Sequence, residues 1–82
     1  MKTVRYSVDA LRGLRRHGNV AVRLRKAIET YAAGEGAHAN NVTRLVGSNA
    51  NRLRVGDWRI IFEETTGEII VTKLGPRGDV YE

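Results

Sequence analysis

The stretch Arg52–Glu63, RLRVGDWRIIFE, decides the fold. Polar and apolar residues alternate on both sides of Gly56-Asp57, which is the pattern of two half-buried antiparallel strands. Glycine at the first central position of a two-residue loop favours a type II′ turn. Such a turn fixes the register, so these residues face one another: Val55 and Trp58, Arg54 and Arg59, Leu53 and Ile60, Arg52 and Ile61. The sequence therefore predicts a tight β-hairpin with strands over 52–55 and 58–63.

Alternation along this hairpin separates its side chains into an apolar and a basic face. The apolar face, which we expect helices to cover, consists of Leu53, Val55, Trp58, Ile60 and Phe62. The opposite face carries Arg52, Arg54 and Arg59. Because Arg54 and Arg59 face each other, the pair is unfavourable unless a carboxylate, solvent or an anionic ligand compensates it.

A third strand is predicted over Glu68–Leu74, which is rich in isoleucine and valine. Thr66-Gly67 supplies the turn before this strand, and Gly75-Pro76 ends it. We expect the strand to bring Leu74 near Arg59.

The same register brings the C-terminal segment to the basic end of the sheet. Arg77 follows the third strand closely, and Tyr81 lies four residues further along. The expected constellation on a concave basic face is Arg52, Arg54, Arg59, Arg77 and Tyr81. A nucleic-acid backbone fits this constellation, because arginine can form two hydrogen bonds to a phosphate and an aromatic ring can stack on a base. An ordinary solvated strand face is the alternative.

A short strand over residues 3–6 and two amphipathic helices are predicted before the hairpin. Ser7 is expected to cap the first helix, in which Leu11 and Leu14 share the core side. His17-Gly18 is expected to end that helix, with glycine in the left-handed conformation.

The second helix is expected to begin at an Asn19 cap and to stop at Gly34. Its apolar positions follow a 3.6-residue period and are Val20, Leu24, Ala27, Ile28 and Tyr31. A long polar connection over 34–51 is expected to follow, anchored by Leu45 and Val46.

Composition agrees with one small globular domain over residues 1–82 and with no linker. The chain is 41% hydrophobic and 28% charged, contains no cysteine, and has a net charge of +5 supplied mainly by arginine. No apolar run approaches the length of a membrane span, and the N-terminus lacks the apolar stretch of a signal peptide. We therefore expect a cytoplasmic protein with a nucleic-acid or acidic protein partner and no membrane partner. The predicted fold class is α+β, β-α-α-β-β-β, with a helical hairpin packed on a small, mostly antiparallel sheet.

Four segments together resemble the RelE/ParE superfamily of bacterial toxin–antitoxin toxins, and its RelE-like branch in particular. They are KTVRY at 2–6, LVG at 45–47, the hairpin block at 52–63 and LGPRGDVY at 74–81. The resemblance covers essentially the whole chain. It implies a RelE-like fold, a cognate antitoxin in a hetero-oligomer, and a ribosome-dependent, metal-independent mRNA endoribonuclease that inhibits translation without a cofactor. A ParE-like toxin that binds DNA gyrase without nuclease activity is the alternative, and a toxin-fold remnant acting in DNA-bound repression is a third.

The resemblance also implies roles for individual residues. Arg59 and Arg77 would contact the phosphate or its transition state, Tyr81 would act in catalysis or base stacking, and Arg52 and Arg54 would bind RNA. Several RelE-like enzymes carry lysines on the first hairpin strand, where this chain has Ala50, Asn51, Arg52 and Arg54.

Other titratable residues are interpreted as structural. Glu63, Glu64 and Glu68 are expected to form a solvated turn and not a metal site. His17 is expected to act as a favourable charge at a helix end. The alternatives left open are an approach of His38 to RNA and a docking role for the basic residues of the two helices.

Overall fold

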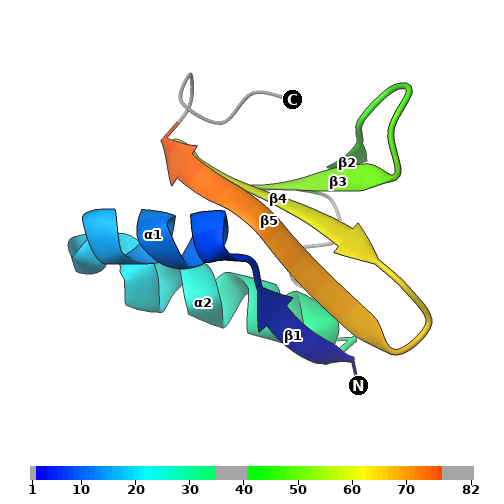
Figure 1. The fold of residues 1–82 in the computed structure, drawn as a ribbon, viewed down its shortest axis with the longest axis horizontal. Helices are drawn as coiled ribbons and strands as arrows, with labels where there is room; N and C mark the ends of the chain where they lie inside the picture. The colour runs from blue at the N-terminus through cyan, green and yellow to red at the C-terminus, as the bar shows by residue number, and fades with distance from the viewer. Residues whose placement is uncertain (1, 35–40, 77–82) are drawn as a thin grey trace.

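A computed structural model of the chain describes residues 2–34 and 41–76. Within these residues a five-stranded sheet of order β1-β5-β4-β3-β2 carries helices α1 and α2 on one side (Figure 1). The elements in chain order are β1 (Thr3–Tyr6), α1 (Val8–Arg16), α2 (Gly18–Ala32), β2 (Val42–Arg44), β3 (Ala50–Val55), β4 (Trp58–Glu64) and β5 (Glu68–Pro76). Only the β1–β5 pair is parallel in the described sheet, so the predicted α+β class and mostly antiparallel sheet are confirmed.

The hairpin between β3 and β4 has the predicted register. Val55 pairs with Trp58 and Arg54 pairs with Arg59 across the turn. Gly56 has a φ of +61°, and among the described residues only glycines have a positive φ, so Asp57 does not. These signs are those of a type II′ turn.

The core lies between the helices and the apolar face of the hairpin. Leu53, Val55, Ile60 and Phe62 are buried there, with Trp58 partly buried beside them. From α2, Leu24, Ala27 and Ile28 are buried against the same cluster, and Val20 and Tyr31 pack at its margin. The predicted apolar face and the core side of the second helix are therefore confirmed.

β5 brings Leu74 near Arg59, as predicted, but Leu74 does not face it. Arg59 faces Gly75, Leu74 faces Ile60, and the strand continues to Pro76. The cause is a bulge: Ile61 pairs with Lys73 but Phe62 pairs with Val71, which leaves Thr72 as an extra residue. The bulge allows Val71 and Leu74, three residues apart, to point into the core together.

Ser7 joins this bulge to the start of α1. Its hydroxyl donates to the carbonyl oxygen of Thr72 at 2.8 Å and accepts from the backbone N–H of Ala10 at 3.0 Å, so the predicted N-cap is confirmed. On α1 the buried residues are Ala10 and Leu14, whereas Leu11 is 40% exposed. The expectation that Leu11 faces the core is wrong: Ala10 and Leu14, one turn apart, form the buried side of α1, and Leu11 lies at its margin.

The junction between the helices also differs from the prediction. Gly18 is the first residue of α2 and has no positive φ, so it is not a left-handed stop, and Asn19 lies inside the helix and is not its cap. His17 makes the break itself, with φ −114° and ψ 46°. Its ring packs edge-on against Trp58 at 4.8 Å between centroids, which holds the junction on the hairpin.

The segment after α2 contains a strand that the sequence did not reveal. Gly34 has a φ of +81° just beyond the helix, as a stop signal requires. Val42–Arg44 then pairs with Asn51–Leu53, so the predicted continuous loop is wrong in this part. Leu45 is buried as expected, but Val46 is fully exposed and anchors nothing. In the described ranges, neither helix is long and apolar enough to cross a membrane.

Candidate nucleic-acid interface

The face of the sheet turned away from α1 and α2, here called the outer face, gathers cations from three neighbouring strands. One row across the sheet is Arg54, Arg59 and Gly75. The next row is Arg52, Ile61 and Lys73. The register thus brings together three of the predicted site residues, Arg52, Arg54 and Arg59.

Arg54 and Arg59 keep the like-charge juxtaposition that the sequence predicts. Arg54 is exposed, and Arg59 is half-buried with its Nη1 donating to the carbonyl oxygen of Trp58 at 3.4 Å. In residues 2–34 and 41–76, the ion pairs within 4.0 Å are Lys2–Glu64, Arg5–Glu68 and Arg12–Asp9. No carboxylate in this part of the chain therefore neutralises the facing arginines, and the pair favours an anion.

Lys73 is a candidate site residue that the sequence interpretation missed. A strand with Leu74 opposite Arg59 would point Lys73 toward the core. The bulge at Thr72 shifts the register, so Lys73 lies exposed on the outer face opposite Ile61. The spacing of Val71 and Leu74 is the signal that could have revealed the bulge. Two apolar residues three positions apart cannot both face the core in a regular strand, because successive side chains point to opposite faces.

Arg77 and Tyr81, which were expected to complete the constellation, lie outside the described residues, as does His38. Their predicted roles remain predictions.

Hydrogen-bond donors converge on a small pocket at the junction of β2 and β3. A cavity of about 110 Å³ is lined by Asn41, Thr43, Arg52 and Arg54. Two arginines, an asparagine and a threonine line it, and no carboxylate is among the described lining residues. Such a set suits a phosphate oxyanion, which accepts hydrogen bonds and carries negative charge.

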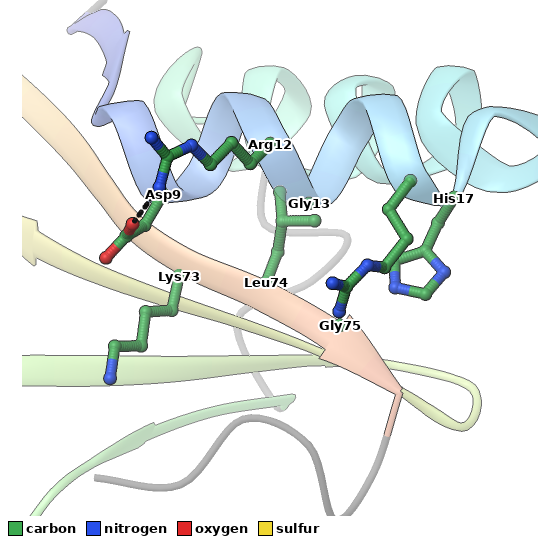
Figure 2. A pocket seen from close by; sticks show the side chains of 8 residues that line it. Asp9, Arg12, Gly13, His17, Lys73, Leu74 and Gly75 are labelled. Atoms are coloured by element: carbon green, nitrogen blue, oxygen red, sulfur yellow. Dashed lines mark ion pairs between the residues drawn. The ribbon is translucent and has the colours of Figure 1, made fainter.

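A second pocket, of about 470 Å³, lies between α1 and the end of β5 (Figure 2). It is lined by Asp9, Arg12, Gly13, Arg16, His17, Lys73, Leu74 and Gly75. Asp9 and Arg12 are ion-paired across 3.9 Å, as the dashed line in Figure 2 shows, so part of its charge is compensated internally. We therefore place the candidate interface on the outer face and not in this pocket.

Two of the three glutamates near the β4–β5 turn, Glu64 and Glu68, have structural partners. Glu64 accepts hydrogen bonds from Lys2 Nζ at 2.7 Å and from the Tyr31 hydroxyl at 2.8 Å, and Glu68 pairs with Arg5 at 3.2 Å. Burial raises the pKa of Tyr31 to about 12, together with its hydrogen bond to Glu64. Burial alone would raise the pKa of Glu64, but the hydrogen bonds from Lys2 and Tyr31 outweigh it and lower that pKa. The described parts of the chain contain no group of three histidine, aspartate or glutamate side chains placed to hold a metal ion.

Comparison with known proteins gives matches only at the level of structure. No family model matches the chain, and no curated protein matches its sequence. Among solved structures, a chain of the E. coli DinJ–YafQ toxin–antitoxin complex has a TM-score of 0.76 at 12% identity, covering 99% of this chain and 98% of that one. The archaeal RelE–RelB complex from Pyrococcus horikoshii gives 0.74 at 21% identity, covering 96% and 98%. The RelB–RelE complex from Methanococcus jannaschii gives 0.69 at 22% identity, covering 89% of each chain. The chain therefore has the RelE-like fold of toxins from toxin–antitoxin systems.

Proposed function

We propose that this protein is the toxin of a toxin–antitoxin system and acts as a ribosome-dependent mRNA endoribonuclease. The observation that carries the proposal is the convergence of Arg52, Arg54 and Arg59 on the outer face of a RelE-like fold. No carboxylate within the described residues lies within 4.0 Å of these guanidinium groups. An RNA backbone supplies the missing negative charge.

The proposed reaction is an internal phosphoryl transfer. The 2′-oxygen of one nucleotide loses its proton and bonds to the adjacent phosphorus, and the bond from that phosphorus to the 5′-oxygen breaks. The 5′-oxygen takes up a proton as it leaves, so the products are a 2′,3′-cyclic phosphate and a 5′-hydroxyl. Negative charge builds up on the phosphorane, where preorganised guanidinium groups stabilise it most.

Arg59 is the proposed transition-state contact, because it lies on β4, the middle strand of the sheet, between Arg54 and Gly75. Arg52 and Arg54 are proposed to hold the neighbouring phosphates. Arg77 is proposed as a second transition-state contact and Tyr81 as a catalytic or base-stacking residue, on the resemblance alone.

The ribosome is proposed to orient the message in this site. Arginine and tyrosine are weak bases at neutral pH, so a free RNA would react slowly here. Holding the 2′-oxygen in line with the phosphorus supplies much of the rate in such reactions. This activity would occur in the cytoplasm, where ribosomes translate.

A cognate antitoxin is proposed as the neutralising partner. Several similar solved structures are complexes of a toxin with its antitoxin, including those from Methanococcus jannaschii and Mycobacterium tuberculosis. An antitoxin that covers the outer face would block the arginines directly.

Inducible expression followed by mapping of transcript 5′ ends tests the proposal. We expect growth arrest, new 5′ ends within translated codons, and loss of both in Arg59→Gln. The control is Arg15→Gln, which removes the same charge from an exposed position on α1. Arrest without new 5′ ends, or inhibited gyrase supercoiling that is insensitive to Arg59→Gln, would contradict the nuclease and favour a gyrase-binding toxin.

A further inference from the structure

A second group of cations lies where α2 passes the edge of β3. Arg23 and Lys26 from α2 and Arg54 from β3 line a pocket of about 370 Å³. The other lining residues are Ala27, Thr30, Asn41, Val55 and Gly56. Within the described sheet β2 pairs only as far as Leu53, so the last two residues of β3 lie beyond the end of β2.

This pocket adjoins the smaller one on the outer face. Arg54 and Asn41 line both pockets. The cations Arg52, Arg54, Arg23 and Lys26 therefore follow one another from the outer face, around the edge of β3, and onto α2. We call this set the edge track.

The local geometry holds Arg23 beside the hairpin turn. A Cβ atom built on Gly56 would lie 2.9 Å from Nη2 of Arg23, so the guanidinium group of Arg23 lies against the turn. Lys26 is three residues further along α2 and so lies on the same side of the helix. The two cations thus face the same pocket from adjacent turns.

The described lining of the pocket suits a phosphate. No carboxylate in residues 2–34 and 41–76 lies within 4.0 Å of Arg23, Lys26 or Arg54. The apolar lining residues, Ala27 and Val55, are 4% and 8% exposed and belong to the core. Among the described lining residues there are three cations and no carboxylate, which suits a phosphate.

We infer that the edge track binds consecutive phosphodiester groups of RNA, with Arg23 and Lys26 holding phosphates beyond those at Arg52 and Arg54. The inference rests on the proposed function and extends its RNA-binding surface from the sheet to α2. The phosphates belong either to the message or to ribosomal RNA, because both present the same group.

Binding measured without cleavage tests the inference. One probe is a fluorescent single-stranded oligouridylate whose 2′-hydroxyls are methylated, so that it has no nucleophile and cannot be cleaved. The other probe is purified ribosomes without message. The variants are Arg23→Gln and Lys26→Gln, with Arg15→Gln as the matched control. Thermal unfolding of each variant checks the fold, and Lys26→Gln keeps the test valid if Arg23→Gln weakens the hairpin turn.

We expect each edge-track variant to reduce the slope of log affinity against log salt for the oligonucleotide by about 0.7, the value for one phosphate contact on a single strand. Arg15→Gln should leave the slope unchanged. If only ribosome binding weakens, the phosphates belong to ribosomal RNA and the inference still holds.

Unchanged affinity and slope for both probes, with wild-type protein that binds and cleaves normally, would overturn the inference and leave the proposed function standing. Loss of antitoxin binding with unchanged RNA binding would also overturn it, in favour of an acidic protein partner. Wild-type protein that neither binds nor cleaves RNA would remove the proposed function and the inference together.

Discussion

Glu64 connects three distant parts of the chain through its two carboxylate oxygens. Lys2 precedes β1, Tyr31 lies near the end of α2, and Glu64 ends β4. The lowered pKa of Glu64 means that the folded protein favours its ionised form. The stabilisation is therefore complete above the pKa of the unfolded chain, about 4.3, and is lost as the pH falls through the lower pKa of the folded state.

The first prediction follows from this carboxylate. Glu64→Gln should lower the free energy of unfolding at pH 7 by about 1 kcal/mol and should flatten its decline below about pH 4. Chemical unfolding across a pH series measures both effects. The control is Glu63→Gln, since Glu63 is exposed and forms no ion pair in the described ranges. Equal pH profiles for the two variants would rule out the role given to Glu64.

The glycines of the helices differ in what surrounds them. A Cβ atom on Gly13 would lie 2.9 Å from the carbonyl oxygen of Leu74 and 2.8 Å from its Cδ1 atom. A Cβ atom on Gly18 would meet nothing within 4 Å. Gly13 is therefore the residue that lets α1 approach β5 closely.

We accordingly predict opposite effects of the same substitution. Gly13→Ala should destabilise the protein by about 1–3 kcal/mol, because the new methyl group would displace the backbone of Leu74. This loss should exceed the gain from the higher helix propensity of alanine. Gly18→Ala should be neutral or stabilise it by up to about 1 kcal/mol. Thermal or urea unfolding of the pair decides this, and a stabilised Gly13→Ala would show that the helix–strand approach is looser than described.

At the scale of elements, the β3–β4 hairpin could be predicted almost completely. Its alternation and the Gly56-Asp57 turn are local signals, and they fixed the register and both faces. β2 could not be predicted, because three residues form a strand here only by pairing with β3. The register of β5 depended on a bulge at Thr72, which is held by Ser7, 65 positions away in the sequence, and by Ile61 on the neighbouring strand.

The hairpin carries a charge repulsion that a substitution should relieve. Arg54→Gln removes one of two directly facing cations and should raise the free energy of unfolding by about 0.2–1 kcal/mol at low salt. Added salt should stabilise the wild type more than the variant, because salt screens the repulsion between Arg54 and Arg59, which only the wild type has. Arg52→Gln is the control, since Arg52 faces Ile61. The same Arg54→Gln protein should bind RNA less tightly. Higher stability together with weaker RNA binding would show that Arg54 serves RNA binding and not the stability of the fold.

At the scale of the whole molecule, the outer face couples folding to anion binding. Any anion that binds the folded state alone raises its stability by mass action. We predict that sodium phosphate raises the melting temperature more than sodium chloride does at equal ionic strength. The extra free energy of unfolding should be about 1 kcal/mol when the phosphate concentration exceeds its Kd several-fold. Differential scanning fluorimetry should show that Arg59→Gln loses this difference and Arg15→Gln keeps it. An equal response of wild type and Arg59→Gln would show that phosphate acts elsewhere.

The candidate site was predictable only where one strand pair sufficed to define it. Arg52, Arg54 and Arg59 follow from alternation within the hairpin. Lys73 depends on the bulge, and Arg23 and Lys26 depend on α2 lying against β3, which no local pattern records. Tertiary packing therefore supplied the part of the basic surface that lies off the hairpin.

The parallel pairing of Thr3–Tyr6 with Glu68–Val71 has a consequence for biosynthesis. While the chain grows on a ribosome, β1 has no neighbour in the sheet until β5 has left the exit tunnel. During the same interval the apolar sides of the helices cannot pack against Ile69 and Val71, which belong to the same core. Such long-range closure is slow and leaves apolar surface exposed, so the nascent domain should complete its fold only after β5 has emerged.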